Sequence, residues 1–505
     1  MSTTQPAKIS VQAAEAVRWT AVGQLYQIVL QFVVIAFLAR LVGPHAYGLV
    51  GTTALLTGVA GVFRDLGVSP TLIQRPELTD RHIATARIMT LGMSLASGIA
   101  IAAGGAILAS FVQQPELGPL CIGLGCVSLV GGLGVVSSAL LQRQLRFRVI
   151  VWVQSAAATL SFAAAVAAAA LGMGAWALVI QGFATALLFA GGMIYFGPRL
   201  PAPRFYRDAA RDLFGMSAGL TGVGVMNLAA ERVSQLFVAR AFGTEAVGLF
   251  ERAYALSRMP VTQIAQVVTR VMVPALSAMQ FDTVEFPRFY RSSLRLTCFL
   301  GFPATIGLAS ISDGVVRIVM GPGWERAIPM LQAFALLGAA HTFCHTMGWV
   351  FTARGRSRAL LLWTTCTLLT RFAAGWIGSR YSVETVAWLW VATDFVALVL
   401  PGIVIVARMT GVPVSDLLRD MLPSLGAALL AGACAYGLQT RLTLPPHLQV
   451  TLLGTFMLSL YLIIHLVART RVGLEARTLI HDWFRRRRGQ QSLALSDGVA
   501  TTKAP

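Results

Sequence analysis

The sequence predicts an all-α, polytopic integral membrane protein with about fourteen transmembrane helices, arranged as two parallel six-helix repeats around a central cavity plus two C-terminal helices. Three observations lead to this fold class. Of the 505 residues, 56% are hydrophobic and 12% are charged, and the mean hydropathy is +0.70. Apolar stretches of about 20 residues, enough to cross a hydrocarbon core of about 30 Å, recur from end to end. A segment near the N-terminus also returns later in the chain.

The apolar stretches define the predicted helices. They are rich in Gly, Ala and Ser and lack the strict alternation of a barrel strand, so helices are the structures that satisfy their backbone groups in lipid. Small residues also allow close helix packing where protein and lipid are equally apolar. We place the fourteen helices near residues 18–38, 46–63, 84–111, 117–140, 149–171, 175–196, 213–239, 246–275, 293–316, 328–350, 358–378, 384–407, 421–439 and 448–468.

The repeat relates residues 37–56 to residues 237–256 without a gap. Eight positions are identical, namely Phe37, Ala39, Arg40, Gly43, Ala46, Gly48, Leu49 and Leu56 with Phe237, Ala239, Arg240, Gly243, Ala246, Gly248, Leu249 and Leu256. Six predicted helices separate the copies, so both have the same orientation in the membrane, as in transporters built from parallel repeats. The predicted parts are an N-terminal lobe over 1–200, a C-terminal lobe over 201–410, an extra helix pair over 411–470 and a basic cytoplasmic tail over 471–505.

The positive charges give the expected orientation. With the N-terminus inside, 28 of the 40 Lys and Arg residues fall in cytoplasmic segments and six fall in the opposite loops. The positive-inside rule then places both termini in the cytoplasm. Because these cations flank membrane helices, the net charge of +19 does not call for a nucleic-acid partner. We expect the Arg485–Arg488 run in the tail to bind anionic membrane lipids.

Polar residues recur on matching helices of the two lobes. Gln27 and Gln31 lie on one face of the first helix, and Asn227 and Glu231 occupy the same positions two hundred residues later. Single amides in membrane helices most often join helices by hydrogen bonds. Their repetition in both lobes instead favours a polar stripe that lines a shared cavity.

Charged residues inside the predicted helices are the main functional indication. A charge near the bilayer centre costs at least about 2.5 kcal/mol unless it is paired or hydrated. There are fewer such acids than arginines, and a guanidinium matches phosphate oxygens in bidentate geometry, so we expect a phosphate-bearing substrate. The arginines are Arg87, Arg232, Arg252, Arg258, Arg270 and Arg371, and the acids are Glu231, Glu251 and Asp394. For Arg87 and Arg270, snorkelling to the membrane interface is an alternative.

No catalytic, metal or cofactor site is indicated. His341 and His345 lie one helical turn apart, but two histidines without a clear third ligand more often line a polar face. The six cysteines fall in apolar spans without a CxxC pair, and no phosphate-binding GxxxxGK[ST] motif is present. We therefore expect that the protein is not an enzyme.

One segment carries a family motif. Gly43, Tyr47 and Gly48 form a Gly-x-x-x-Tyr-Gly pattern, and a second signature follows the second predicted helix. That signature consists of Asp65, Leu66, Gly67 and Gln74. Residues 38–75 thereby resemble the first repeat of Wzx-type polysaccharide transporters, in the multidrug/oligosaccharidyl-lipid/polysaccharide exporter superfamily.

The resemblance implies a flippase of the bacterial inner membrane. Such a protein moves an undecaprenyl-diphosphate-linked oligosaccharide repeat unit to the outer leaflet by alternating access, for exopolysaccharide, capsule or O-antigen synthesis. An ion gradient would drive it, with Glu231, Glu251 or Asp394 as proton carriers. The polymerase and co-polymerase of the same pathway are candidate partners.

Two other functions stay open. A multidrug antiporter of the same superfamily would share the lobes, but it usually has twelve helices and an acidic, aromatic cavity. A membrane polysaccharide polymerase or glycosyltransferase would normally carry large outer loops with catalytic motifs, and the predicted outer loops are only a few residues long.

Overall fold

The computed structural model describes residues 4–65, 67–75, 77–442, 445–468 and 470. These residues form helices joined by turns and loops, and no strand occurs among them, which confirms the predicted all-α class. Contacts divide the chain into two compact units. The first unit runs to Leu256 and also contains Val315–Phe334 and Arg358–Leu398. The second unit contains Ser257–Gly314, Ala335–Ser357 and the chain from Val399 onward.

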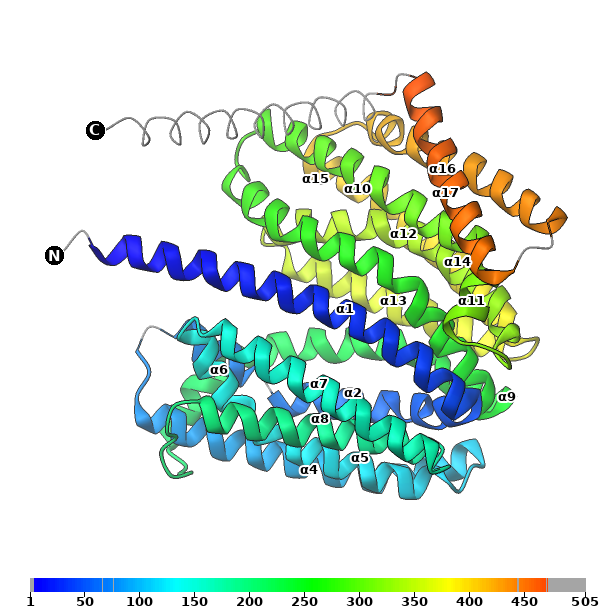
Figure 1. The fold of residues 1–505 in the computed structure, drawn as a ribbon. Helices are drawn as coiled ribbons and strands as arrows, with labels where there is room; N and C mark the ends of the chain where they lie inside the picture. Colours follow the sequence, from blue (N-terminus) through cyan, green and yellow to red (C-terminus); the bar gives the residue numbers. More distant parts are fainter. Residues whose placement is uncertain (1–3, 66, 76, 443–444, 469, 471–505) are drawn as a thin grey trace, which may run out of the picture. The chain divides into compact units, whose positions relative to one another are not determined.

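The first unit begins with eight helices (Figure 1). They are α1 Thr4–Thr52, α2 Ala54–Asp65, α3 Val68–Gln74, α4 Asp80–Val112, α5 Leu117–Gly132, α6 Val135–Arg143, α7 Phe147–Ala170 and α8 Ala175–Phe196. Helix α4 packs along α5, α7 packs along α8, and α1 packs along α7. Short turns connect α4 to α5 and α7 to α8, so these neighbours in sequence are also neighbours in space.

Glycine allows α4 and α5 to approach closely. A Cβ added to Gly98 would lie 2.8 Å from the carbonyl oxygen of Gly125, and a Cβ on Gly125 would lie 2.6 Å from the carbonyl oxygen of Gly98. Both distances are too short for a real Cβ. The small residues noted in the sequence therefore bring two backbones together, which is how membrane helices gain packing energy without a hydrophobic force between them.

Helix α9, Arg207–Ala278, begins in the first unit and continues into the second. It bends at Gly243, where φ is 83° and ψ is 175°, and α1 bends in the same way at Gly43, where φ is 79° and ψ is 171°. This backbone region is open essentially to glycine alone. The two repeat copies thus form the same bent helix because each has a glycine at the same position.

The remaining elements of the C-terminal half include two breaks in helix geometry. The first break is the π-helical turn Phe395–Val399, which lies just before Pro401. Because proline has no N–H, Pro401 cannot donate the usual helical hydrogen bond to the carbonyl of Ala397. A second break separates Glu285–Ser310 from Ser312–Val319. The elements are α10 Glu285–Ser310, α11 Ser312–Val319, the 3₁₀ turn Glu325–Ala327, α12 Ile328–Ala353, α13 Ser357–Gly378, α14 Val383–Asp394, the π turn Phe395–Val399, α15 Leu400–Thr410, α16 Val414–Arg441 and α17 Pro446–Val467.

In the second unit, α16 packs against both α10 and α17. Ion pairs fasten α10 to α16: Arg291 Nε lies 2.6 Å from Asp420 Oδ2, and Arg295 Nη1 lies 3.1 Å from Asp420 Oδ1. Arg291 Nη1 also lies 2.8 Å from Asp416 Oδ2. These contacts join the predicted extra helix pair to its neighbouring helix by charge as well as by packing.

The linker after α8 lies against the start of α4. Thr85 Oγ1 donates to the carbonyl of Arg204 at 3.4 Å and accepts from the backbone N–H of Tyr206 at 3.1 Å. Farther on, Asp212 accepts a 2.7 Å hydrogen bond from Arg75, with His82 3.5 Å away. The hydrogen bond from Arg75, together with His82, holds the pKa of Asp212 below its usual range. The linker and the first turns of α9 are therefore fixed to the N-terminal helices.

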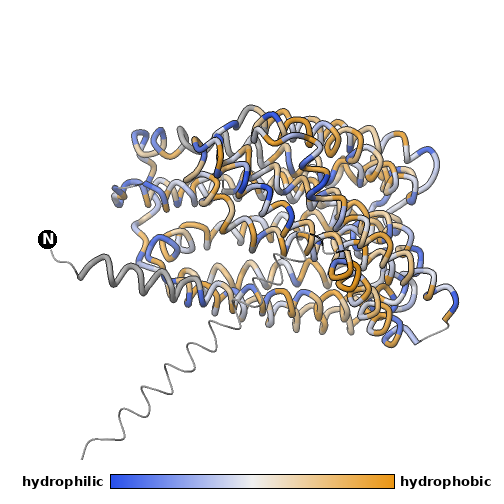
Figure 2. The backbone as a smooth tube through the Cα atoms, turned by 90° about the horizontal axis from the view of Figure 1, so that it is seen from above, coloured by the Kyte–Doolittle hydropathy of each residue, from blue (hydrophilic) through white to orange (hydrophobic). Residues whose placement is uncertain are grey.

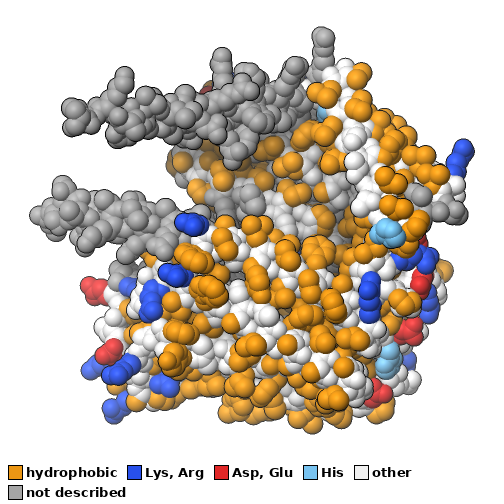
Figure 3. Space-filling view, in the orientation of Figure 1, with side chains coloured by type: hydrophobic (Ala, Val, Ile, Leu, Met, Phe, Trp, Pro, Cys, Tyr) orange, Lys and Arg blue, Asp and Glu red, His pale blue; other side chains and the backbone are white. Residues whose placement is uncertain are grey.

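The helices have the lengths and composition of membrane spans. Nine helices within the described residues are long and apolar enough to cross a bilayer, and the pair Glu285–Ser310 and Ser312–Val319, bent by 76°, would make ten as one span. Figure 2 shows hydrophobic residues along the helices and hydrophilic ones at many turns. Figure 3 shows hydrophobic side chains over the face formed by α4, α5, α7 and α8, with charges gathered toward its ends. The protein is therefore a multi-pass membrane protein.

Several sequence-based expectations remain untested. The number of fourteen helices and the lobe boundaries at residues 200, 410 and 470 stay predictions. The basic tail with Arg485–Arg488 lies outside the described residues, as does the side chain of Arg270.

Candidate functional site

Within the first unit, the two repeat copies pack against each other through glycine. A Cβ on Gly48 would overlap the carbonyl oxygen of Thr244 and lie 3.1 Å from the backbone nitrogen of Gly248. A Cβ on Gly248 would overlap the carbonyl oxygen of Pro44 and lie 2.9 Å from the backbone nitrogen of Gly48. The contact is thus reciprocal, and backbone meets backbone at matching positions of the repeat.

A carboxylate lies directly beside this glycine contact. Glu251 follows Gly248 by about one helical turn, and a Cβ on Gly51, its counterpart in the first copy, would lie 2.9 Å from Glu251 Oε2. Arg232 Nη1 donates to Glu251 Oε1 at 3.1 Å, and Arg252 Nη2 lies 3.3 Å from the same oxygen. Two guanidinium groups therefore share one carboxylate, and the cluster carries a formal net charge of +1.

Aromatic side chains hold Arg252 in place. Its Cζ lies 4.7 Å from the centroid of the Tyr47 ring, a cation–π contact. Tyr47 packs edge-on against Trp324 at 5.9 Å between ring centroids, and Trp324 Nε1 donates to the carbonyl of Ala39 at 3.1 Å. Tyr47 and Trp324 are both buried. The guanidinium is thus positioned by a rigid wall as well as by Glu251.

The cluster contains unused hydrogen-bond donors. Among the described residues, no acceptor reaches the buried Nε atoms of Arg232 and Arg252 or the buried Nε2 of Gln235. A buried donor that lacks an acceptor costs about 1–3 kcal/mol. An incoming acceptor oxygen, such as that of a phosphate, a sugar hydroxyl or water, would remove this cost. The arrangement is therefore suited to bind a group rich in oxygen acceptors.

Arg371 and Asp394 form a second, separate pair. Arg371 Nη2 lies 2.5 Å from Asp394 Oδ2, and the side chains are 4% and 0% exposed. The Arg371 Cζ also lies 3.8 Å from the centroid of the Trp390 ring. Ser234 Oγ accepts from Trp390 Nε1 at 2.9 Å and donates to the carbonyl of Arg371 at 2.5 Å, which ties α9 to α13 and α14. In this conformation both charged groups are shielded from solvent.

The other predicted site residues are distributed along several helices. Gln27 and Glu231 are half-buried, whereas Gln31 and Asn227 are exposed. Arg87 Nη1 donates to the carbonyl of Pro201 in the linker at 2.9 Å. Arg258 belongs to the second unit, whereas the Glu251 cluster belongs to the first. The structure therefore joins Arg232 and Arg252 to Glu251, and Arg371 to Asp394.

Sequence reasoning missed three contributors to the cluster: Gly51, Tyr47 and Trp324. An indication for Gly51 was available, because the two-hundred-residue offset aligns it with Glu251. In the sequence, Tyr47 stands out only as part of a family motif. Nothing in the sequence indicated that Trp324 contacts Tyr47 and Ala39, which lie nearly three hundred positions earlier.

Comparison with known proteins places the chain in a family. Residues 37–329 match the family described as "Polysaccharide biosynthesis protein". The teichuronic acid biosynthesis protein TuaB of Bacillus subtilis is 25% identical over 390 residues, which cover 76% of this chain and 80% of TuaB. The lipopolysaccharide biosynthesis protein WzxC of Escherichia coli is 26% identical over 344 residues, which cover 67% of this chain and 69% of WzxC. The succinoglycan biosynthesis transport protein ExoT of Rhizobium meliloti is 25% identical over 389 residues, which cover 74% of this chain and 76% of ExoT.

Solved structures show the same fold at lower identity. The lipid II flippase MurJ in an inward closed conformation aligns with a TM-score of 0.68 and 16% identity, over 89% of this chain and 98% of MurJ. An inward-facing multidrug transporter of the MATE family in the MOP superfamily aligns with a TM-score of 0.61 and 14% identity, over 79% of this chain and 98% of that protein. The match over residues 37–329 shows that the chain belongs to the polysaccharide biosynthesis protein family, so the resemblance identified in residues 38–75 is confirmed.

Proposed function

We propose that this protein is a flippase that moves undecaprenyl-diphosphate-linked oligosaccharide repeat units across the bacterial inner membrane, for the synthesis of a surface polysaccharide. The observation that carries the proposal is the cluster of Arg232, Glu251 and Arg252 at the contact between the two repeat copies. Relatives named for teichuronic acid, lipopolysaccharide and succinoglycan biosynthesis support this substrate class.

The cluster suits the difficult part of the substrate. Each sugar hydroxyl that loses water without a new partner costs roughly 1–3 kcal/mol, so an oligosaccharide does not cross lipid unaided. Arg232 and Arg252 offer charge and unused Nε donors to a diphosphate, while the polyprenyl chain stays in lipid. The further proposed substrate-binding residues are Arg258, Arg371, Arg87, Arg270, Gln27, Gln31 and Asn227.

Sharing of Glu251 suggests how ion and substrate are linked. While Glu251 is ionised, it occupies both guanidinium groups. Protonation of Glu251 removes this carboxylate partner, and a substrate phosphate then takes its place. Protonation of Glu251 and binding of a substrate phosphate to the two arginines would therefore favour each other, which links the protonation state of Glu251 to substrate binding. Glu231 and Asp394 remain the other proposed proton carriers.

The proposed setting follows from the distribution of cations. Both termini lie in the cytoplasm, the substrate enters from the cytoplasmic leaflet, and rocking of the lobes exposes it to the outer leaflet. A polymerase and a co-polymerase of the same pathway are the proposed partners, because they consume the translocated unit.

Export by arginine variants tests the proposal. In a strain whose own flippase is deleted, the native chain should restore surface polysaccharide, and Arg232→Ala or Arg252→Ala should lower it at least about tenfold. Lipid-linked units should accumulate inside. Arg→Lys at either position should recover export only partly, because an ammonium group has no bidentate fork. Arg288→Ala is the matched control, because its side chain is 80% exposed.

Three outcomes would contradict the proposal. Full export by both alanine variants, at matched protein levels, would remove the cluster from substrate binding. Failure of the native chain to restore polysaccharide, together with drug resistance that depends on Glu251, would indicate a multidrug antiporter. Conversion of lipid-linked units to polymer by the purified chain alone would indicate a polymerase.

A further inference from the structure

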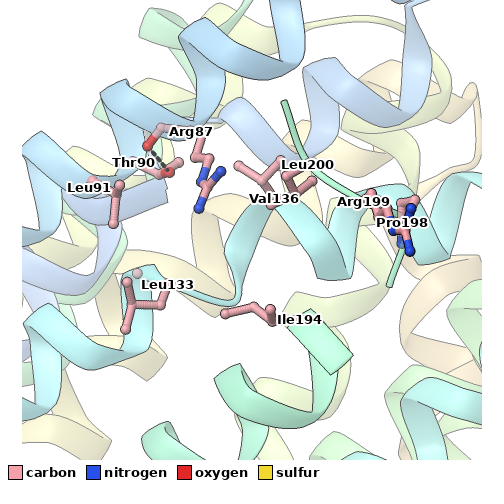
Figure 4. A pocket seen from close by; sticks show the side chains of 10 residues that line it. Arg87, Thr90, Leu91, Leu133, Val136, Ile194, Pro198, Arg199 and Leu200 are labelled. Carbon is pink, nitrogen blue, oxygen red and sulfur yellow. Dashed lines mark hydrogen bonds between the residues drawn. The ribbon is translucent and has the colours of Figure 1, made fainter. Parts of the chain in front are cut away.

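A cavity of about 380 Å³ lies within the first unit, at the end of α4 and α8 that adjoins the linker (Figure 4). Helix α4 contributes Arg87 and Thr90, the break between α5 and α6 contributes Leu133, and α8 contributes Ile194. Arg199 of the linker completes it. The cavity therefore combines four helices with the segment that connects the two lobes in sequence.

The break between α5 and α6 opens the wall of this cavity. Helix α5 ends at Gly132 and α6 starts at Val135. Gly132 packs so closely on α4 that an added Cβ would overlap Ser94, whereas Leu133 is 44% exposed. A continuous helix of larger residues would fill this place. Leu133 and Ile194 both line the cavity, and Figure 4 shows the Arg87 guanidinium pointing toward them.

The cationic side of the cavity is held in place before any ligand binds. Arg87 is half-buried, and its Nη1 donates to the carbonyl of Pro201 at 2.9 Å. At the last residue of α8, just before the linker, the carbonyl of Phe196 accepts a 3.2 Å hydrogen bond from Arg146 Nη1. Hydrogen bonds thus hold the backbone on both sides of Arg199, at Phe196 before it and at Pro201 after it. The cost of ordering the Arg87 guanidinium on ligand binding is therefore small.

Charge in the cavity is of one sign. Its lining includes two arginines and no acidic side chain. Within the described part of the chain, neither Arg87 nor Arg199 forms an ion pair, in contrast to Arg232, Arg252 and Arg371. Two arginines and no acid in the lining favour an anion with several acceptor oxygens.

The opposite side of the cavity is apolar and faces outward. Ile194 is 49% exposed, and it is followed by the exposed side chains of Tyr195 and Phe196 at the end of α8. In a multi-pass membrane protein, exposed apolar side chains near a helix end contact lipid. A ligand that suits both sides carries an anionic head and a hydrocarbon chain, and basic pockets between helix ends bind anionic lipid headgroups in this way.

We propose that this pocket binds an anionic phospholipid, with its phosphate at Arg87, the positive charge of Arg199 on the linker adding to the attraction, and an acyl chain along Leu133 and Ile194. The bound lipid contacts both α4 and the linker. It thereby strengthens the connection that the hydrogen bond between Arg87 and Pro201 already makes. This pocket is separate from the Glu251 cluster. Arg87, which is also among the proposed substrate-binding residues, is the one residue common to both proposals, and phospholipid binding here does not require transport.

Lipid titration of the purified full-length chain tests the site. Native mass spectrometry should show phosphatidylglycerol bound with at least about tenfold higher affinity than phosphatidylcholine. The double variant Arg87→Ala/Arg199→Ala should lose about tenfold in phosphatidylglycerol affinity. The double variant Arg288→Ala/Arg326→Ala, which removes two exposed arginines elsewhere, should bind as the native chain does.

A single variant guards against misfolding. Arg199 is exposed, so Arg199→Ala should leave thermal unfolding unchanged and still weaken phosphatidylglycerol binding several-fold. Equal phosphatidylglycerol binding by the native chain and Arg199→Ala would overturn the proposal. Displacement of phosphatidylglycerol by millimolar inorganic phosphate would also overturn it, because the pocket would then hold a free anion. Equal binding of both phospholipids would overturn it as well, because the arginines would then not select an anionic headgroup.

Discussion

The two repeat copies have the same backbone and different charges. Each copy bends at a glycine with nearly the same angles, Gly43 in α1 and Gly243 in α9, and each offers a glycine, Gly48 or Gly248, to the other. One turn later the copies differ. The first copy has Gly51, whereas the second has Glu251 between two arginines.

This difference separates the residues that shape the fold from those that give the site its chemistry. Positions that are glycine in both copies fix the bend and the crossing of the helices. The position that is glycine in one copy and glutamate in the other gives the carboxylate room, because a Cβ on Gly51 would lie 2.9 Å from its oxygen. We call the backbone contact made by the glycines of both copies the frame. Substitutions in the frame should lower stability, whereas substitutions in the Glu251 cluster should lower export.

The largest expected effect is on the frame. Gly48→Ala and Gly248→Ala each place a Cβ onto a backbone carbonyl, which no side-chain movement relieves, so each should cost more than about 3 kcal/mol and sharply lower the yield of folded protein. Size-exclusion chromatography and thermal unfolding in detergent measure this. Gly61→Ala is the control, because nothing lies within 4 Å of its added Cβ. Equal yields for all three variants would mean that the copies do not need this close contact.

The next effect is on the charge. Glu251→Gln keeps the size of the side chain but leaves Arg232 and Arg252 without their shared carboxylate. Export should fall at least about tenfold while most of the protein still folds, because the variant removes the proposed proton carrier. Surface polysaccharide at matched protein levels measures this. Glu245→Gln is the control on the same helix, with its side chain 53% exposed. Normal export by Glu251→Gln would leave the carboxylate as a purely structural partner.

The smallest expected effect is the loss of stability when the glycine at either bend is replaced, and it compares the two copies directly. Gly43→Ala and Gly243→Ala each force an L-residue into a backbone region essentially reserved for glycine, at a cost of about 1–3 kcal/mol. Nothing lies within 4 Å of either added Cβ, so strain is the whole effect and should be similar in both copies. Thermal unfolding should show comparable decreases. A large decrease in only one copy would show that the bends are not equivalent.

Much of the fold could be predicted because lipid allows few backbone structures. Helices followed from apolar runs, whereas the repeat aligned Gly43 with Gly243 without showing that a helix bends at each of them. Breaks inside predicted spans were less visible. The π turn before Pro401 and the gap at Leu133 depend on local hydrogen bonding, which hydropathy does not register.

The sequence could show which charged residues belong to the site, but it could not show which of them form ion pairs with each other. Intramembrane charge alone singled out Arg232, Glu251, Arg371 and Asp394, because each is expensive in lipid. Pairing was not accessible, since it depends on which helices lie side by side. Thus the sequence did not show that Arg371 pairs with Asp394 and that Glu251 serves two arginines.

The reciprocal glycine contact also has a consequence for the two copies. Because Gly48 meets the backbone of the second copy and Gly248 meets that of the first, a mutation at either position damages the same contact. The contact therefore requires glycine at both positions. Positions 51 and 251 differ, and the small Gly51 leaves room for the Glu251 carboxylate. The chain thus carries an acid in one copy only and keeps the close crossing of its helices in both.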